Sequence, residues 1–312
     1  MGSEGDVVPS EGNGASPEMD EVPSEGDGLP PETRIGRTAL TVSDLPEMAD
    51  FYRDVVGFSV LGRSDATAVL GVEGTPLLVL EHDPEAPTRR RSGAGLFHNA
   101  FRVPSRGALG DALARVQERW QLGGASDHGV SEALYLTDPE GNGIEIYRDY
   151  PREEWPRSDD GTVRMGTYPL DLEPVEAAAA GDSKLPAGTD VGHVHLEVSS
   201  LATFRDFYVD RVGFETQTAM PAALFVAAGG YHHHLGANTW NHRSGPAEGR
   251  GVSWFEVVLP DGAALEALEG RLADGEHAVT EVDDGVSVTG PDGIEVRFRV
   301  GTSHPILPGS YL

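Results

Sequence analysis

The chain has 312 residues, and its 51 acidic side chains outnumber its 23 basic ones, which gives a formal net charge of −28 at pH 7. This balance argues against a nucleic-acid partner, because proteins bind phosphates mainly through Lys and Arg. The sequence has no cysteine and no apolar run of the roughly 18 residues that a membrane span needs, and we expect no secretory leader, because the first residues lack a basic segment followed by an apolar one. We therefore expect a cytoplasmic protein without disulfides, thiolate metal ligands or a membrane partner.

Residues 1–33 carry nine acidic side chains and no basic one, and they are rich in Gly, Pro, Ser and Glu. Such a segment has too little apolar surface to bury, so we predict a disordered acidic tail. Residues 34–150 follow as an N-terminal half. Residues 151–189 form a second polar stretch, interpreted as a linker that is partly helical at best, and residues 190–312 form a C-terminal half.

Each half is predicted to hold two units of one plan, a strand followed by a helix and further short strands. In the first unit these elements fall at residues 37–42, 46–56, 68–72 and 76–81. In the second unit they fall at residues 97–103, 109–120, 133–137 and 143–148. Ser43 and Asp44 are suited to cap the first helix, and Pro46 suits its first turn.

An internal repeat relates the two halves. Residues 35–45 match residues 191–201 at an offset of 156. Near the ends of the halves, residues 138–145 resemble residues 290–295 at an offset of 150, so that Glu295 falls opposite Glu145. The sequence therefore predicts an α+β fold of four βαβββ modules in two duplicated halves.

The predicted strand at residues 192–198 has two different faces. Its apolar residues alternate with His193, His195 and Glu197, and alternate residues of a strand point to opposite sides of the sheet. We expect the apolar face to pack against a helix and the histidine face to line a cavity.

Three segments, residues 95–104, 126–147 and 229–236, resemble the catechol 2,3-dioxygenase branch of the vicinal oxygen chelate superfamily, which also contains glyoxalase I and bleomycin-resistance proteins. The resemblance covers residues 34–300. It implies that each paired set of modules forms a U-shaped sheet around a cavity, and that metal ligands lie on the first and last strands of a module.

The resemblance implies a metal site built from His98, His193 and Glu145. Two histidines and one carboxylate leave positions open on the metal, as oxygenases need. No sequential half supplies this set, because the fourth module carries Trp254 where a ligand histidine would stand. We therefore predict that modules two and three pair to build the working cavity, and that modules one and four pair structurally.

Several alternatives stay open at the metal site. His195 points the same way as His193 and could replace it as the ligand. Glu295 is a counter-candidate for Glu145, although an ion pair with Arg37, Arg297 or Arg299 also explains it. The pairing of modules could also join two chains.

The run His232, His233, His234 resembles the acid–base segment of extradiol dioxygenases. Ring cleavage of a catechol needs a group that takes a phenolic proton and later returns one. The match favours His233 for this role, with His195, His232 and His234 as neighbours that bind substrate or support the site.

His128 and Tyr135 precede Glu145 by 17 and 10 residues. In the family, these places hold a substrate-binding histidine and tyrosine, which would stabilise charge on the substrate oxygens. An ordinary strand aromatic remains an equal explanation for Tyr135.

The resemblance thus implies an extradiol dioxygenase whose Fe(II), which Mn(II) could replace, inserts O2 into a small aromatic diol to give a muconic semialdehyde. Two alternatives stay open: a glyoxalase-like metal-dependent isomerase or transferase, and a non-catalytic binding protein of the bleomycin-resistance kind. The sequence does not decide which diol is the substrate or whether the chain forms a homo-oligomer. Arg102 could meet a carboxylate substituent or form a salt bridge.

The acidity of the chain indicates the salt concentration in which the protein works. The predicted tail holds only nine of the 51 acids, and Lys184 is the single lysine of the chain. At 1 M salt the Debye length is about 3 Å, so carboxylate repulsion is largely screened. We therefore expect a halophilic protein whose fold depends on salt.

Overall fold

The computed structural model describes residues 28–159, 161–273 and 278–301. Most of the predicted acidic tail, residues 1–27, lies outside the described residues. Residues 28–33 are described, and Leu29 is buried, with its backbone N–H donating to Gly213 O at 2.8 Å. In these residues no helix is long and apolar enough to cross a membrane.

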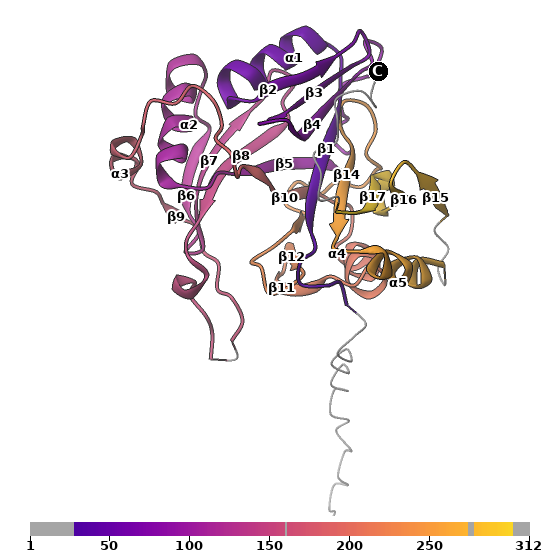
Figure 1. The fold of residues 1–312 in the computed structure, drawn as a ribbon. Coiled ribbons are helices and arrows are strands. Elements are labelled where there is room, and N and C mark those ends of the chain that lie inside the picture. Colours follow the sequence, from indigo (N-terminus) through magenta and orange to yellow (C-terminus); the bar gives the residue numbers. More distant parts are fainter. Residues whose placement is uncertain (1–27, 160, 274–277, 302–312) are drawn as a thin grey trace, which may run out of the picture.

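The described strands form two sheets, which Figure 1 shows meeting near the middle of the molecule. The first sheet has the order β15-β16-β17-β14-β1-β4-β3-β2. Its strands are β1 (Arg34–Val42), β2 (Ser59–Arg63), β3 (Thr67–Val72), β4 (Thr75–His82), β14 (Gly251–Leu259), β15 (Val279–Val282), β16 (Gly285–Thr289) and β17 (Glu295–Val300).

The second sheet has the order β11-β12-β13-β10-β5-β8-β7-β6-β9. Its strands are β5 (Gly95–Arg102), β6 (Gly124–Asp127), β7 (Ser131–Thr137), β8 (Gly143–Asp149), β9 (Tyr168–Pro169), β10 (Asp190–Glu197), β11 (Glu215–Met220), β12 (Ala223–Ala227) and β13 (Leu235–Asn238).

This strand order joins modules that are not neighbours in sequence. β1 of module one pairs antiparallel with β14 of module four, and β5 of module two pairs antiparallel with β10 of module three. The predicted pairing of modules two and three, and of one and four, is therefore confirmed, and it occurs within one chain. The α+β class and the four-module plan are confirmed as well.

The helices cover the sheets through their apolar faces. They are α1 (Leu45–Phe51) with the π-helical turn η1 (Tyr52–Val56), α2 (Arg106–Arg119), η2 (Arg152–Glu154), α3 (Leu172–Ala177), α4 (Leu201–Arg205) with the π-helical turn η3 (Asp206–Arg211), α5 (Gly262–Ala273) and η4 (Pro291–Gly293). The predicted cap of the first helix is confirmed, because the Asp44 side chain accepts from Glu47 N. Tyr52 and Tyr208, equivalent in the repeat, are both fully buried in the core.

The polar stretch at residues 151–189 packs more closely than a plain linker. It supplies η2, α3 and the short edge strand β9, which pairs with β6. Trp155 and Val163 are buried in a small cluster with Tyr231. The sequence did not reveal this, because buried residues lie far apart among charged ones there.

Candidate metal centre

Three neighbouring strands of the second sheet bring the predicted metal ligands together. Ala100 on β5 lies opposite His193 of β10 and beside Glu145 of β8, and His98 lies two residues before Ala100 on the same face of β5. Ala100 is fully buried. Its short side chain leaves room for three larger side chains to converge above it.

The ligand atoms of these three side chains lie within hydrogen-bonding distance of one another. His98 Nε2 is 3.3 Å from His193 Nε2, and Glu145 Oε2 is 3.0 Å from His98 Nε2 and 3.2 Å from His193 Nε2. Three ligands bound at right angles, about 2.1 Å from one ion, would lie about 3.0 Å apart. The observed triangle therefore fits one face of a metal's coordination shell, and it is the metal-ligand cluster found among the described residues.

The charge states of this cluster suit metal binding. Burial would raise the pKa of Glu145, but the hydrogen bonds between its carboxylate and the His98 and His193 rings hold that pKa well below the usual range. Burial lowers the pKa of His193 to about 4, so its ring is neutral at neutral pH. An ionised carboxylate and a neutral imidazole are the forms that bind metals.

A cavity of about 420 Å³ opens above the cluster. The three ligands lie at its base together with four of the other predicted site residues, His128, Tyr135, His195 and His233. Its remaining walls are mostly apolar and come from Phe97, Val130, Met165, Met220, Phe225 and Trp240, with Ser126, Ser131, Gly166 and Thr167. A ligand bound in the cavity would thus meet polar groups at the base and apolar surface elsewhere.

His128 and Tyr135 form a hydrogen-bonded pair beside Glu145. His128 Nδ1 donates to Gly166 O at 2.7 Å, so Nε2 accepts from the Tyr135 hydroxyl at 2.6 Å. Burial and the nearby Glu145 carboxylate raise the pKa of Tyr135. Its hydroxyl therefore stays protonated, and Tyr135 lines the cavity beside the ligands.

His195 lines the cavity but does not join the ligand triangle. Its Nε2 accepts from Asn238 Nδ2 at 3.1 Å. The orientation of Asn238 is fixed, because its Oδ1 accepts from Trp240 N at 3.2 Å. The geometry thus separates His193, whose Nε2 faces Glu145, from His195, whose Nε2 is already bonded.

The histidine run divides into three different positions. His233 lines the cavity and packs on His193, with ring centroids 4.0 Å apart. His232 lies behind it, with Nδ1 2.8 Å from His233 Nδ1. His234 turns away, because its Nδ1 accepts from Ala228 N at 3.2 Å, and burial lowers its pKa to about 3. His234 therefore anchors the backbone, while the other two rings form a chain that leads from the cavity.

The first sheet holds no comparable site among its described residues. Trp254 donates from Nε1 to Glu81 Oε1 at 2.9 Å and lies under the Arg297 guanidinium, 3.9 Å from its ring centroid. Glu256 is buried between Arg37 and Arg299 and accepts hydrogen bonds from both. Aromatic and ion-paired side chains thus fill the space that the ligands occupy in the second sheet.

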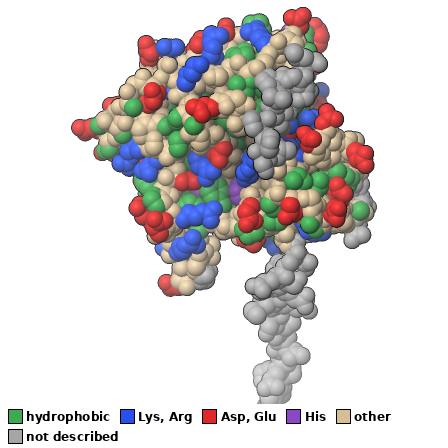
Figure 2. Space-filling model, viewed as in Figure 1, with side chains coloured by type: hydrophobic (Ala, Val, Ile, Leu, Met, Phe, Trp, Pro, Cys, Tyr) green, Lys and Arg blue, Asp and Glu red, His purple; other side chains and the backbone are tan. Residues whose placement is uncertain are grey.

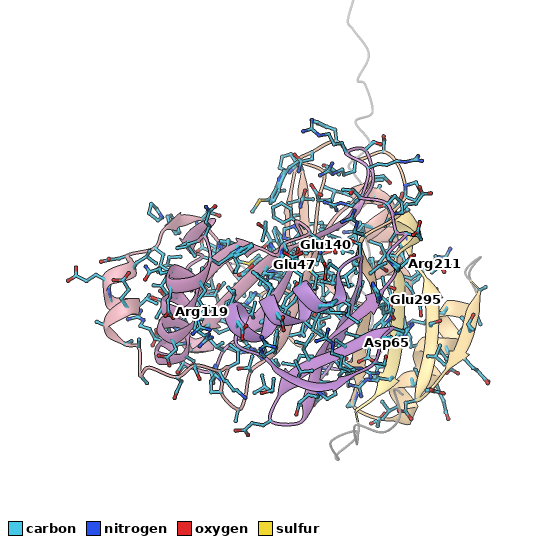
Figure 3. The ribbon with its side chains drawn as sticks, turned by 90° about the horizontal axis from the view of Figure 1, so that it is seen from above. Glu47, Asp65, Arg119, Glu140, Arg211 and Glu295 are labelled. Atoms are coloured by element: carbon cyan, nitrogen blue, oxygen red, sulfur yellow. The ribbon has the colours of Figure 1, made fainter. Side chains whose placement is uncertain are left out.

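The match of Glu295 to Glu145 by sequence motif was wrong in register. Asn99 pairs with Ile144 in the second sheet, whereas its repeat equivalent Phe255 pairs with Val296. Arg297 therefore occupies the position equivalent to Glu145. Figure 3 shows Glu295 beside the yellow strands of the first sheet, at the start of β17. There it forms the ion pair with Arg297 that had been weighed against a ligand role, at 2.7 Å.

Arg102 forms salt bridges and does not line the cavity. It pairs with Asp190 at 2.6 Å and with Asp149 at 3.0 Å. Asp149 itself was missed by the sequence reasoning, although it follows Glu145 by four residues on the same strand and so points to the same side of the sheet. Met165, from the supposed linker, was missed too, because no local pattern connects it with the site.

Comparisons with known proteins agree on one family. Residues 34–146 match the family model described as the glyoxalase/bleomycin resistance protein/dioxygenase superfamily. Catechol-2,3-dioxygenase of Bacillus subtilis (strain 168) is 41% identical over 279 residues, which cover 86% of this chain and 98% of that protein. Biphenyl-2,3-diol 1,2-dioxygenase 3 of Rhodococcus globerulus is 30% identical over 120 residues, 37% of this chain and 63% of that protein.

Solved structures share the fold at low sequence identity. A candidate dioxygenase from Bacillus subtilis superimposes with a TM-score of 0.61 at 15% identity, covering 86% of this chain and 84% of that one. Glyoxalase I from Zea mays gives a TM-score of 0.50 at 16% identity, covering 86% and 92%. These likenesses show the fold alone.

Proposed function

The chain belongs to the glyoxalase/bleomycin resistance protein/dioxygenase superfamily, and from this membership and its site we propose that it is an extradiol dioxygenase that cleaves catechol-type diols with O2. The observation that carries the proposal is the buried triangle of His98, His193 and Glu145 at the base of a mostly apolar cavity. The site thus combines metal ligands with room for an aromatic ring.

A glyoxalase-like site with a second carboxylate fits these strands poorly. Modules two and three can be aligned at the N-caps of their helices, which are Ser105 and Ser200. In this alignment Ala100 of module two is equivalent to His195 of module three. Glu145 lies beside Ala100, whereas Gly236 lies beside His195. A Cβ at Gly236 would meet the His195 ring at 3.0 Å. The position in module three that corresponds to Glu145 is therefore occupied by Gly236, beneath the His195 ring. No second carboxylate reaches the ligand triangle from there.

The donor set suits Fe(II), and Mn(II) could take its place, because two imidazoles and a carboxylate discriminate weakly between these ions. Bound there, the metal would hold both diol oxygens and O2 and let electrons pass between them. A non-catalytic binding protein would not need three converging ligand atoms. We therefore assign His98, His193 and Glu145 as the ligands.

The remaining cavity residues provide proton chemistry and orientation. Burial keeps the pKa of His233 well below its usual value, so its ring enters the reaction neutral. Its place in the cavity lining puts a ring nitrogen where a diol hydroxyl can pass it a proton. The same nitrogen can return the proton when the ring opens. The Tyr135 hydroxyl can turn from His128 to donate to a diol oxygen, and the apolar walls exclude water around the aromatic ring.

The test uses protein purified without oxygen and loaded with Fe(II). Addition of catechol in air should consume O2 and form a yellow product that absorbs from the near-ultraviolet to the blue. Protein loaded with Mn(II) serves for comparison. The proposal fails if catechol gives no O2 uptake with either metal while the metal-loaded protein isomerises a hemithioacetal.

A further inference from the structure

A chain of hydrogen bonds runs from the cavity to Asp149 on β8, buried at the two histidines and half-buried at the aspartate. His233 Nδ1 is 2.8 Å from His232 Nδ1, and His232 Nε2 is 2.9 Å from Asp149 Oδ1. His232 is 1% exposed, and its ring packs on Tyr231 with centroids 4.0 Å apart. The chain is therefore held rigidly and lies largely out of solvent.

The direction of each hydrogen bond in this chain follows from its last member. Arg102 and the Tyr231 hydroxyl both donate to Asp149 Oδ2, at 3.0 and 2.9 Å. Asp149 is half-buried, and although desolvation would raise its pKa, its bonds to His232 and Arg102 lower it. An ionised carboxylate only accepts hydrogen bonds, so the proton of His232 must lie on Nε2.

The remaining protons follow when each of the two rings carries a single proton, as a neutral imidazole does. His232 with its one proton on Nε2 then offers a lone pair at Nδ1. His233 must donate to it from its own Nδ1. The second ring nitrogen of His233, Nε2, is then left with a lone pair for the cavity.

Resting on the proposed function, we propose that Asp149 and His232 are positioning residues that fix the tautomer of His233 and hold its Nε2 ready to accept a diol proton. The chain also gives the charge a place to go. When His233 Nε2 takes a proton, its Nδ1 proton can cross the 2.8 Å bond to His232. The positive charge then lies beside the Asp149 carboxylate, away from the metal ligands. His233 becomes neutral again with its proton on Nε2, from which it returns to the product.

Asp149→Asn tests this chain with almost no change in shape. The amide oxygen will take the Oδ2 position, because Arg102 and Tyr231 both donate there. The amide nitrogen then faces His232 and donates to Nε2. This reverses the chain, so that His233 carries its proton on Nε2 and cannot accept one from the diol.

The first readout is the ¹⁵N NMR spectrum of the histidine rings in metal-free protein, which does not depend on turnover. His233 should be protonated on Nδ1 in the wild type and on Nε2 in Asp149→Asn. The second readout is turnover by the Fe(II)-loaded protein. We expect kcat for catechol to fall about 10–100-fold, with little change in KM and with the iron content retained.

Two further variants separate positioning from packing. Tyr231→Phe removes a hydrogen bond to the same carboxylate but leaves the His232–Asp149 bond, so it should keep the wild-type tautomer and kcat. His232→Phe keeps a ring packed on Tyr231 yet offers His233 no acceptor, so it should lower kcat like Asp149→Asn.

The proposal is overturned if His233 carries its proton on Nε2 in the wild type. It is also overturned if iron-replete Asp149→Asn keeps the wild-type kcat, or if Tyr231→Phe loses as much. A wild-type protein that shows the expected tautomer but turns over no diol would refute the proposed function alone.

Discussion

Ala100 is the residue on which the geometry of the proposed metal site depends most. It lies between His193 and Glu145 in the strand register and contacts Ala133 and Tyr147. No ligand chemistry marks this alanine in the sequence. Its role follows from its size, because a larger side chain here would fill the space in which the ligands meet.

We predict that Ala100→Val destroys metal binding without unfolding the protein. Ala39 is a matched control, because it is a fully buried alanine on the first strand of its module and lies opposite Trp254 as Ala100 lies opposite His193. Overpacking should cost about 1–3 kcal/mol of unfolding free energy in each variant. Iron binding and thermal unfolding measure the two effects separately. Equal iron loss in Ala39→Val and Ala100→Val would contradict this role.

At the scale of the elements, the sequence predicted the features that a local residue pattern determines, such as strand faces and helix starts. The offset of 156 between the halves identified equivalent strands, the Asp44 cap placed the first helix, and alternation placed His193 on the cavity side of β10. The residue of module four that is equivalent to Glu145 was predicted two residues too early, as Glu295 instead of Arg297. The register of β17 depends on the turn before it and on its pairing with β14, which local sequence does not specify.

The walls of the cavity lead to a prediction about the diol. Of the described side chains that line it, Glu145 is the only carboxylate, and none is Lys or Arg. A carboxylated diol would therefore bury a charge without a partner, which costs several kcal/mol. If burial of the charge costs about 2.7 kcal/mol, the rate falls about 10²-fold. We therefore expect 3,4-dihydroxybenzoate to show a kcat/KM about 10²-fold below that of its methyl ester.

The methyl ester keeps the size and the electron withdrawal of the acid but not its charge, so comparison of kcat/KM for the pair isolates the charge. Met220 lies at the cavity and is 46% exposed. Met220→Arg should raise kcat/KM for the acid relative to the ester. Equal rates for acid and ester in the wild type would show that the wall does not select against charge.

At the scale of the whole molecule, the site requires both halves of the sequence. His98 and Glu145 come from the N-terminal half and His193 from the C-terminal half, and they meet because β5 pairs with β10. This pairing was predicted from the ligand count rather than from strand propensity. The repeat alone could not have chosen it, since every module has the same plan.

The net charge of −28 leads us to propose that the fold needs salt. Figure 2 shows acidic and basic side chains interspersed over one face. Several arginines are bound to carboxylates in buried ion pairs, such as Arg37 with Glu256, so the 51 acids of the chain outnumber still further the basic side chains that remain for the surface. Their repulsion is screened in concentrated salt and acts against the folded state in dilute buffer.

Circular dichroism can measure this dependence. Transfer from about 2 M KCl to low ionic strength lengthens the Debye length from a few ångströms to about 30 Å. We expect the spectrum to lose its helical and strand signal and the unfolding temperature to drop. An unchanged spectrum and unfolding temperature would remove the argument for salt adaptation.

The central claim is that His98, His193 and Glu145 bind the metal, and the iron content of two matched variants tests it most directly. Both Glu145→Gln and Glu295→Gln remove one carboxylate from the end strand of a module, and only Glu145 faces two histidines. After anaerobic loading with Fe(II), the wild type and Glu295→Gln should hold about one iron per chain, and Glu145→Gln should hold almost none. Iron retained in Glu145→Gln but lost from Glu295→Gln would place the site in the other sheet and contradict the account.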